Sequence, residues 1–203
     1  MQRGMTTVDE LLQLLGDWED DRRHDAVRRL LTVPPEAIVD RLGSALSRKN
    51  DWLARANAAA LLGQLGDPAA VTRLVTGVAE ETVDSVKQAE LLALTELWLA
   101  LGDGFDQPFD TAVHGLSPTH LENLTEALTR VNHMGGPAKF KTAVRKFAKI
   151  ALPQRAATSI DVRKHAEARR TVREEIRRDG LYEFHGIAYA YEKDGSLLIL
   201  SSG

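Results

Sequence analysis

The 203-residue sequence contains no cysteine, and this absence excludes several kinds of chemistry. Without thiols there are no disulfides, no cysteine nucleophile, no iron–sulfur cluster and no cysteine-ligated zinc. No apolar run approaches the roughly 20 residues that a membrane-spanning helix needs. Near the N-terminus, acidic residues occur before any long apolar stretch, which is atypical of a secretory signal. We therefore expect a cytoplasmic protein of bacterial type that does not contact membranes.

Net charge is also low, at −3, but it is unevenly distributed along the chain. Residues 1–135 hold 12 Lys and Arg against 21 Asp and Glu, whereas residues 136–180 hold 13 against 5. Residues 181–203 are slightly acidic, with 1 against 3. Asymmetry of this kind is informative where the total is not. We divide the chain into acidic helical repeats (1–135), a basic helical pair continuing the array (136–180) and a C-terminal cap (181–203).

Motifs of catalysis and metal binding are missing as well. The sequence has no HExxH motif, EF-hand loop or zinc-finger spacing, and no Gly-x-Ser-x-Gly elbow. Gly102-Asp103-Gly104 lacks the lysine of a phosphate-binding loop, so it predicts a turn. Asp106, Asp110 and His114 have a spacing that could share one helical face, but we interpret them as solvated loop residues. The sequence predicts no enzyme activity, no metal and no cofactor.

The sequence does contain amphipathic helices, because apolar residues recur with a 3.6-residue period almost throughout. Glycine and proline interrupt the pattern at 66–68 and 135–137, and Ser117-Pro118 is a typical helix start. The last two helices are expected at about 137–151 and 159–179. We predict a mainly α-helical fold of about ten helices.

The helices of the N-terminal part repeat at a spacing in the middle thirties. Asp17-Trp18 and Asp51-Trp52 are 34 residues apart, and Leu-Gly-Asp recurs at 65–67 and 101–103. A period of this length, built from two short helices, is typical of an α-solenoid. We interpret the tryptophans at 18, 52 and 98 as wedges between layers, the alternative being a row of exposed aromatics that grips a peptide.

Residues 35–103 resemble bacterial HEAT-like repeats, with a degraded copy over 1–34. Asp51, Arg55 and the alanines and leucines that follow match the second helix of such a repeat, and Gly66-Asp67-Pro68 leads into the next. Lys87 stands at the arginine position of a weaker second copy. The resemblance implies a short α-solenoid of stacked helix pairs with a concave docking surface. Arg55 would reach back to the Asp51 carboxylate or to the carbonyls of the adjacent repeat.

The segment from Leu181 changes character, because all three tyrosines lie there and Asp194-Gly195 is a turn signal between β-prone runs. We predict a β-hairpin over about 182–191 and 196–200. A lone hairpin is marginal in water, so it should pack on the last helices as a cap or pair with another chain. A homo-oligomer could form through this hairpin or through the acidic and basic halves.

The basic block supplies the candidate binding site. Between Glu126 and Asp161 no acidic residue occurs, and the expected helix 137–151 carries its lysines opposite an apolar stripe. In the next helix, by contrast, arginines and glutamates alternate at i, i+4 and would stabilise an exposed helix. The candidate residues for an anionic partner are Lys139, Lys141, Arg145, Lys146, Lys149 and Arg155.

Two functions remain open from the sequence. The first is a non-catalytic scaffold that binds an unknown protein partner. The alternative is a nucleic-acid-binding protein that uses the basic helix, since HEAT-like proteins include DNA-handling members. Only Phe140 and Phe147 could stack on bases there, and both lie on the apolar stripe.

Overall fold

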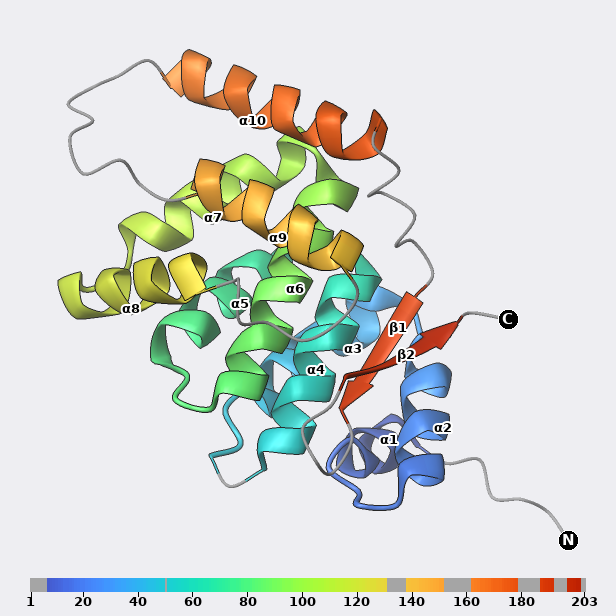
Figure 1. The fold of residues 1–203 in the computed structure, drawn as a ribbon. Helices are drawn as coiled ribbons and strands as arrows, with labels where there is room; N and C mark the ends of the chain where they lie inside the picture. The colour runs from blue at the N-terminus through green and yellow to red at the C-terminus, as the bar shows by residue number, and fades with distance from the viewer. Residues whose placement is uncertain are drawn as a thin grey trace, which may run out of the picture.

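The computed structural model describes residues 7–49, 51–130, 138–151, 162–178, 187–191 and 197–201, with side chains of 7–49, 51–130, 141–151 and 167–178 (Figure 1). The prediction of a mainly helical fold with about ten helices is confirmed. The helices within these ranges are α1 (Val8–Leu14), α2 (Asp20–Leu30), α3 (Pro35–Ala45), α4 (Trp52–Leu65), α5 (Ala69–Glu80), α6 (Asp84–Leu101), α7 (Asp103–His114), α8 (Pro118–Thr129), α9 (Ala138–Ala151) and α10 (Val162–Arg178).

Capping residues fix several helix boundaries. The side chain of Thr7 accepts a hydrogen bond from the Glu10 amide, and the Thr7 amide donates one to the Glu10 carboxylate, which makes a capping box at α1. Asp51 caps α4 by accepting from the Ala54 amide at 2.9 Å. Gly66 ends α4 with φ 69°, a left-handed conformation that favours glycine. Local sequence therefore sets where these helices begin and end.

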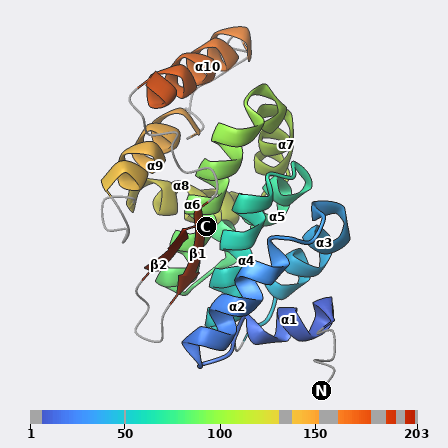
Figure 2. The same cartoon turned by 90° about the vertical axis from the view of Figure 1, so that its right-hand side faces the viewer.

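The helices are arranged in pairs that stack into two layers (Figure 2). In one layer α1, α3 and α5 are successive neighbours, and in the other α2, α4 and α6 are. Both α7 and α8 pack on α5 and extend the first layer, while α9 packs on α6 and extends the second. The last helix, α10, lies over α7 and α9. This is the layering of a short solenoid, with an irregular unit after the third pair.

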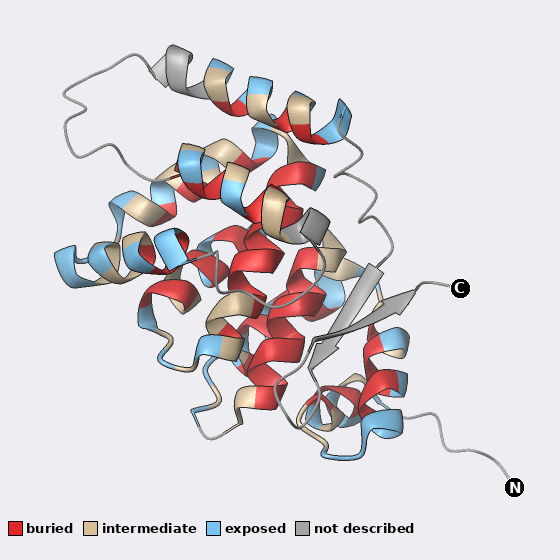
Figure 3. Cartoon of the chain, in the orientation of Figure 1, coloured by how far each residue is buried: buried red, intermediate tan, exposed pale blue. Residues whose placement is uncertain are grey.

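Burial is concentrated in α4 and α6, the central helices of the second layer (Figure 3). Small residues allow these two helices to approach closely, since α4 is alanine-rich from Ala54 to Ala60. The two helices lie close together at Gly63, where an added Cβ would lie 2.7 Å from the Ala93 Cα of α6. The small side chains of α4 are thus required for its close contact with α6.

A Gly63→Ala variant is therefore expected to be less stable than the unaltered chain, by about 1–3 kcal/mol, because the new methyl group meets backbone. The measurement is the free energy of unfolding in urea. Gly104→Ala is the matched control, since its Cβ would meet nothing closer than 4.0 Å. That control should gain up to about 1 kcal/mol in helix propensity. Equal stability of the two variants would contradict the close contact between α4 and α6.

Helix α7 differs from the expectation of solvated loop residues at 106, 110 and 114. Pro108 lies inside this helix and, because proline has no amide proton, it removes one backbone hydrogen bond there. Phe105, Phe109 and Ala112 are nevertheless buried at a helical spacing. Gly102, with φ 58°, allows α7 to begin directly after α6. Packing of this apolar face outweighs the hydrogen bond lost at the proline.

Two strands follow the helices, β1 (Ile187–Tyr191) and β2 (Leu197–Ser201). They are antiparallel, with Ile187 opposite Ser201, and β1 lies against α4 and α2 (Figure 1). The residues that join the strands lie outside the described ranges. The predicted hairpin, its role as a cap and its use in self-association therefore stay predictions.

Candidate functional site

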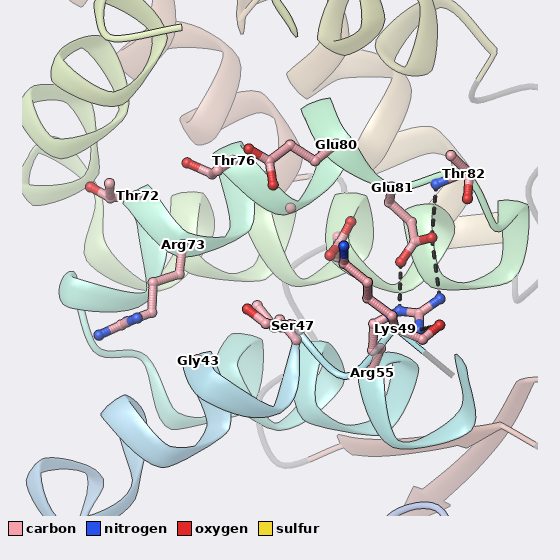
Figure 4. Close-up of a pocket in the computed structure, with 13 residues that line it drawn as sticks. Gly43, Ser47, Lys49, Arg55, Thr72, Arg73, Thr76, Glu80, Glu81 and Thr82 are labelled. Atoms are coloured by element: carbon pink, nitrogen blue, oxygen red, sulfur yellow. Dashed lines mark hydrogen bonds and ion pairs between the residues drawn. The ribbon is translucent and has the colours of Figure 1, made fainter. Parts of the chain in front are cut away.

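A polar hollow of about 780 Å³ lies in the first layer, between α3 and α5 (Figure 4). The C-terminal end of α3 and the turn after it form one wall, and α5 forms the other. Arg55 of α4 and Glu90 of α6 reach it from the second layer. The lining residues are Gly43, Leu46, Ser47, Lys49, Arg55, Thr72, Arg73, Thr76, Gly77, Glu80, Glu81, Thr82 and Glu90.

An ion pair between Arg55 and Glu81 forms one side of this hollow (Figure 4). Arg55 Nε donates to Glu81 at 2.8 Å, and both side chains are largely buried. Arg55 Nη1 also donates to the carbonyls of Arg48 and Lys49, at 2.6 and 2.9 Å. The expectation for Arg55 was thus right about backbone carbonyls, but they belong to the turn of its own helix pair. The side chain of Arg55 therefore holds the turn between α3 and α4 in place.

Glu81 is fully engaged, because its carboxylate also accepts from two backbone amides. The amides of Thr82 and Val83 each donate to Glu81 Oε1 at 2.8 Å. These bonds, together with Arg55, stabilise the charged carboxylate and the start of α6. Glu81 is therefore a structural group of the hollow, with its acceptor positions already in use.

Glu90 is different, since it is only 1% exposed and its Oε2 atom has no hydrogen-bond partner. Burial raises the pKa of Glu90 well above its usual value, and the nearby Glu81 carboxylate raises the pKa further. Arg55 and Lys87 lower it by less, so the direction is upward. A buried carboxyl without partners is costly in a folded protein, and such groups are often functional.

The backbone of α5 is shaped around this carboxyl. A Cβ on Gly77 would lie 2.3 Å from Glu90 Oε1, so the glycine leaves the space that the carboxyl occupies. The helices α4 and α6 begin 32 residues apart, at Trp52 and Asp84, and this offset places Glu90 at the position of buried Ala58. The sequence therefore held a signal for Glu90, because this acid occupies a position where the preceding repeat has alanine. The periodicity of apolar residues alone did not identify it.

The predicted basic site lies on α9, where the structure places part of it. The apolar stripe is buried as expected at Val144, Phe147 and Ala151. On the other face Arg145 and Lys149 are exposed and Lys141 is half-buried. The side chain of Lys139 and all of Arg155 lie outside the described residues. The structure therefore brings together Lys141, Arg145, Lys146 and Lys149 along one helix.

An acidic residue does offset this basic face, contrary to the expectation from the sequence. Lys146 lies 3.6 Å from the Glu175 carboxylate, which α10 brings over α9. Arg145 donates through Nε to the carbonyl of Lys141 at 3.1 Å. The sequence placed these groups on separate helices, and only the packing of α10 on α9 brings the opposite charges together.

A second cluster, which we call the arginine clamp, was not predicted; it comprises Arg169, Arg170 and Arg173 of α10 with Asp103, Asp106 and Asp110 of α7. Arg169 Nη2 donates to Asp110 at 2.7 Å, and Arg173 bonds both Asp103 and Asp106. The Arg170 hydrogen bond lowers the pKa of Asp103, and the charge of Arg173 contributes to the shift. Asp106 and Asp110 are thus arginine acceptors rather than solvated residues.

Aromatic rings underlie the arginine clamp. The guanidinium of Arg169 lies 5.6 Å from the Phe109 ring centroid, and that of Arg173 lies 5.8 Å from the Trp98 ring. Arg177 adds a hydrogen bond to the Leu99 carbonyl at the end of α6. Sequence reasoning attributed the α10 arginines to pairs within their own helix. The signal it missed was the matching spacing of aspartates on α7.

The tryptophans divide between the two interpretations. Trp98 is fully buried and its ring lies 5.3 Å from that of Phe147, as a wedge between layers should. Trp52 is partly buried against the core. Trp18 is 52% exposed and meets the edge of Trp52 at 6.3 Å, so the wedge interpretation is wrong for Trp18.

Comparison with known proteins agrees with this architecture. The sequence model of the HEAT repeats family matches residues 8–95, which cover α1 to α5 and most of α6. This part of the chain is similar to the HEAT repeats, a family of stacked helix pairs that commonly serve as protein-interaction scaffolds. The match begins earlier than the resemblance over 35–103 and includes the degraded first copy. No curated protein and no solved structure matches the chain.

Two further observations concern the described side chains and helices only. Within them, no group of three or more His, Asp and Glu side chains is arranged to hold a metal ion. None of the described helices is both long and apolar enough to cross a membrane.

Proposed function

We propose that this protein is a non-catalytic interaction module whose HEAT-like repeats bind a protein partner in the hollow between α3 and α5. The observation that carries the proposal is the hollow itself. The helices α3 and α5 supply its walls, α4 and α6 contribute one side chain each, and the hollow is lined with hydroxyl, carboxyl and guanidinium groups. Repeat arrays of this kind expose such surfaces to peptides and proteins.

The site lies on the face of the first helices of each pair rather than on the second helices. The strand β1 lies on α4 and α2, so in this proposal the C-terminal segment covers part of the opposite face. The polar character of the hollow suits a partner segment that contributes hydrogen bonds and charges as well as apolar contact. This proposal includes a scaffold role, a cytoplasmic location and a bacterial origin.

A nucleic-acid-binding function through α9 is the second candidate, supported by one observation. Among the side chains described, Lys141, Arg145 and Lys149 have no carboxylate partner within ion-pair distance. Such cations could neutralise phosphates, with an affinity that falls steeply with salt. The pairing of Lys146 with Glu175 reduces the positive charge available on this face.

Selection of random displayed peptides against the whole chain distinguishes the two functions. The proposal predicts micromolar peptides whose binding weakens at least tenfold in a Thr76→Arg variant, which places a bulky cation inside the hollow. Duplex DNA and single-stranded RNA, titrated at two salt concentrations, should show no comparable binding. Salt-sensitive DNA binding lost in Arg145→Glu/Lys149→Glu, without any peptide selected, would favour the second candidate instead. A Glu36→Gln variant on exposed α3 surface is the control.

A further inference from the structure

We propose that the hollow between α3 and α5 takes a lysine side chain of the partner protein, and that the lysine ammonium binds the unpartnered carboxyl of Glu90. This inference rests on the proposed function, because it names the chemistry of the group that the scaffold would hold. It follows from the state of the polar groups that line the hollow.

Most of the other charged groups of the hollow have partners within the chain; the exception among the described side chains is Lys49, which is exposed to solvent. Arg55 and Glu81 bind each other, and Glu81 accepts two further amides. Arg73 donates to Asp40 at 2.8 Å. Glu80 is exposed, and its carboxylate lies 4.0 Å from the His120 ring. Glu90 alone among these acids is buried with an oxygen that has no partner, so it is the group that a ligand would satisfy.

The position of Glu90 adds a second, independent argument. The equivalent position in the preceding repeat is a buried alanine, so the repeat fold does not require an acid there. Gly77 in turn leaves the space for the carboxyl, because any side chain at that position would contact it. Glu90 and Gly77 therefore lower the stability of the fold and are not needed for helix packing. Residues of this kind occur at functional sites.

Lysine fits this geometry better than arginine. The Glu90 carboxyl is only 1% exposed, so the approach to it is narrow, which suits a compact ammonium on a slender stem. A planar guanidinium is bulkier and carries five donors, most of which would find no acceptor along so narrow an approach. Leu46, Gly43 and Gly77 provide apolar contact for methylene groups, and the hydroxyls of Ser47 and Thr76 line the same hollow. The acidic charge of residues 1–135 attracts a cationic partner over longer distances.

Binding of an ammonium would also change the ionisation of Glu90. The groups that act on this carboxyl are Glu80 and Glu81, which favour its neutral form, and Arg55 and Lys87, which favour its charged form. Because burial dominates, the carboxyl of the free protein keeps its proton to a higher pH than an ordinary glutamate. An arriving cation favours the carboxylate, so the proton leaves to solvent as the ammonium binds.

The test uses the peptides selected above on the whole chain, measured by calorimetry in two buffers of different ionisation enthalpy. We expect the selected peptides to share a lysine and their binding to release protons at a pH between the usual glutamate pKa of 4.5 and the raised pKa of Glu90. Replacing that lysine by Nε-acetyllysine, or Glu90 by glutamine, should weaken binding at least tenfold. Arginine in place of lysine should weaken it about threefold or more. Glu80→Gln, in the same hollow but exposed, should change binding less than threefold.

Each result separates the two proposals. Peptides that bind at the hollow, shown by their sensitivity to Thr76→Arg, but are indifferent to Glu90→Gln and to lysine acetylation would overturn the lysine site and leave the scaffold function standing. Failure to select any peptide would overturn both. Thermal unfolding of Glu90→Gln confirms that the variant is folded, so that lost binding cannot be attributed to misfolding.

Discussion

An Arg173→Ala variant is expected to lose about 2–3 kcal/mol of stability in the docking of α10, the largest effect of any side chain in the arginine clamp. Arg173 is almost fully buried, bonds two aspartates and lies over the Trp98 ring. Without Arg173, the negative charge of Asp106, whose side chain is only 15% exposed, would be less fully balanced by positive charge. Asp103 is 59% exposed, so in the variant water would hydrate its carboxylate. The loss of stability is therefore smaller than that expected for a fully buried ion pair.

Hydrogen exchange of the α10 amides is the measurement, because it reports opening of this helix separately from global unfolding. Arg170→Ala is the matched control, since Arg170 bonds the same Asp103 but is exposed. Exposed ion pairs contribute less than about 1 kcal/mol, so the control should retain most of its protection. Equal loss of protection in both variants would show that Arg173 is not the centre of the arginine clamp.

The same contacts should make α10 docking sensitive to acid. The pKa of Asp103 is lowered from its usual 3.8 in the folded protein, chiefly by the Arg170 hydrogen bond. Its contribution to stability is therefore complete above pH 3.8 and is lost as pH falls through the lower, folded value. Exchange of the α10 amides should accelerate in that range before the rest of the chain unfolds.

A Glu90→Gln variant is expected to be more stable than the unaltered chain at neutral pH and equally stable near pH 4. The pKa of Glu90 is raised in the folded state, so its favourable contribution is present below its usual 4.5 and is lost as pH rises toward the folded value. Over that interval the stability of the unaltered chain should fall by about 1.4 kcal/mol per pH unit relative to the variant.

Urea unfolding at intervals from pH 4 to pH 8 measures this difference directly. Glu80→Gln serves as the control, because Glu80 is exposed and its replacement should leave the pH dependence unchanged. Parallel curves for Glu90→Gln and the unaltered chain would mean that Glu90 ionises normally, and would remove the basis for treating it as a strained group.

Sequence periodicity was sufficient for the helices and for the repeat. The i, i+3, i+4 spacing identified the elements, and the buried face of α9 followed from its apolar stripe. The prediction of solvated loop residues was wrong at α7, although Phe105 and Phe109 have a helical spacing on either side of Pro108. Local rules describe the backbone preference of proline. Whether a helix tolerates a proline depends on whether tertiary packing offsets the lost backbone hydrogen bond.

The candidate sites were harder to foresee because they depend on contacts between distant segments. Arg170 has Glu174 at i, i+4, and this local pattern directed attention to pairs within α10, although Arg169 and Arg173 bond aspartates of α7. Glu90 likewise resembles one more acid in an acidic half until its burial is known. Charge along a chain indicates which groups could meet, while only the fold determines which do.

The arginine clamp also has a consequence for the order of folding. Arg173 and Asp103 are 70 residues apart, whereas helices within a pair meet their neighbours across short turns. Closing so long a loop costs entropy that local contacts do not, so the pairs α1 to α6 should assemble first. Until α10 arrives, the aspartate face of α7 repels itself and the rings of Trp98 and Phe109 lack their cover. Docking of α10 is therefore the step that completes the native state, and mutations in the arginine clamp should leave the rate of early assembly unchanged while they speed unfolding.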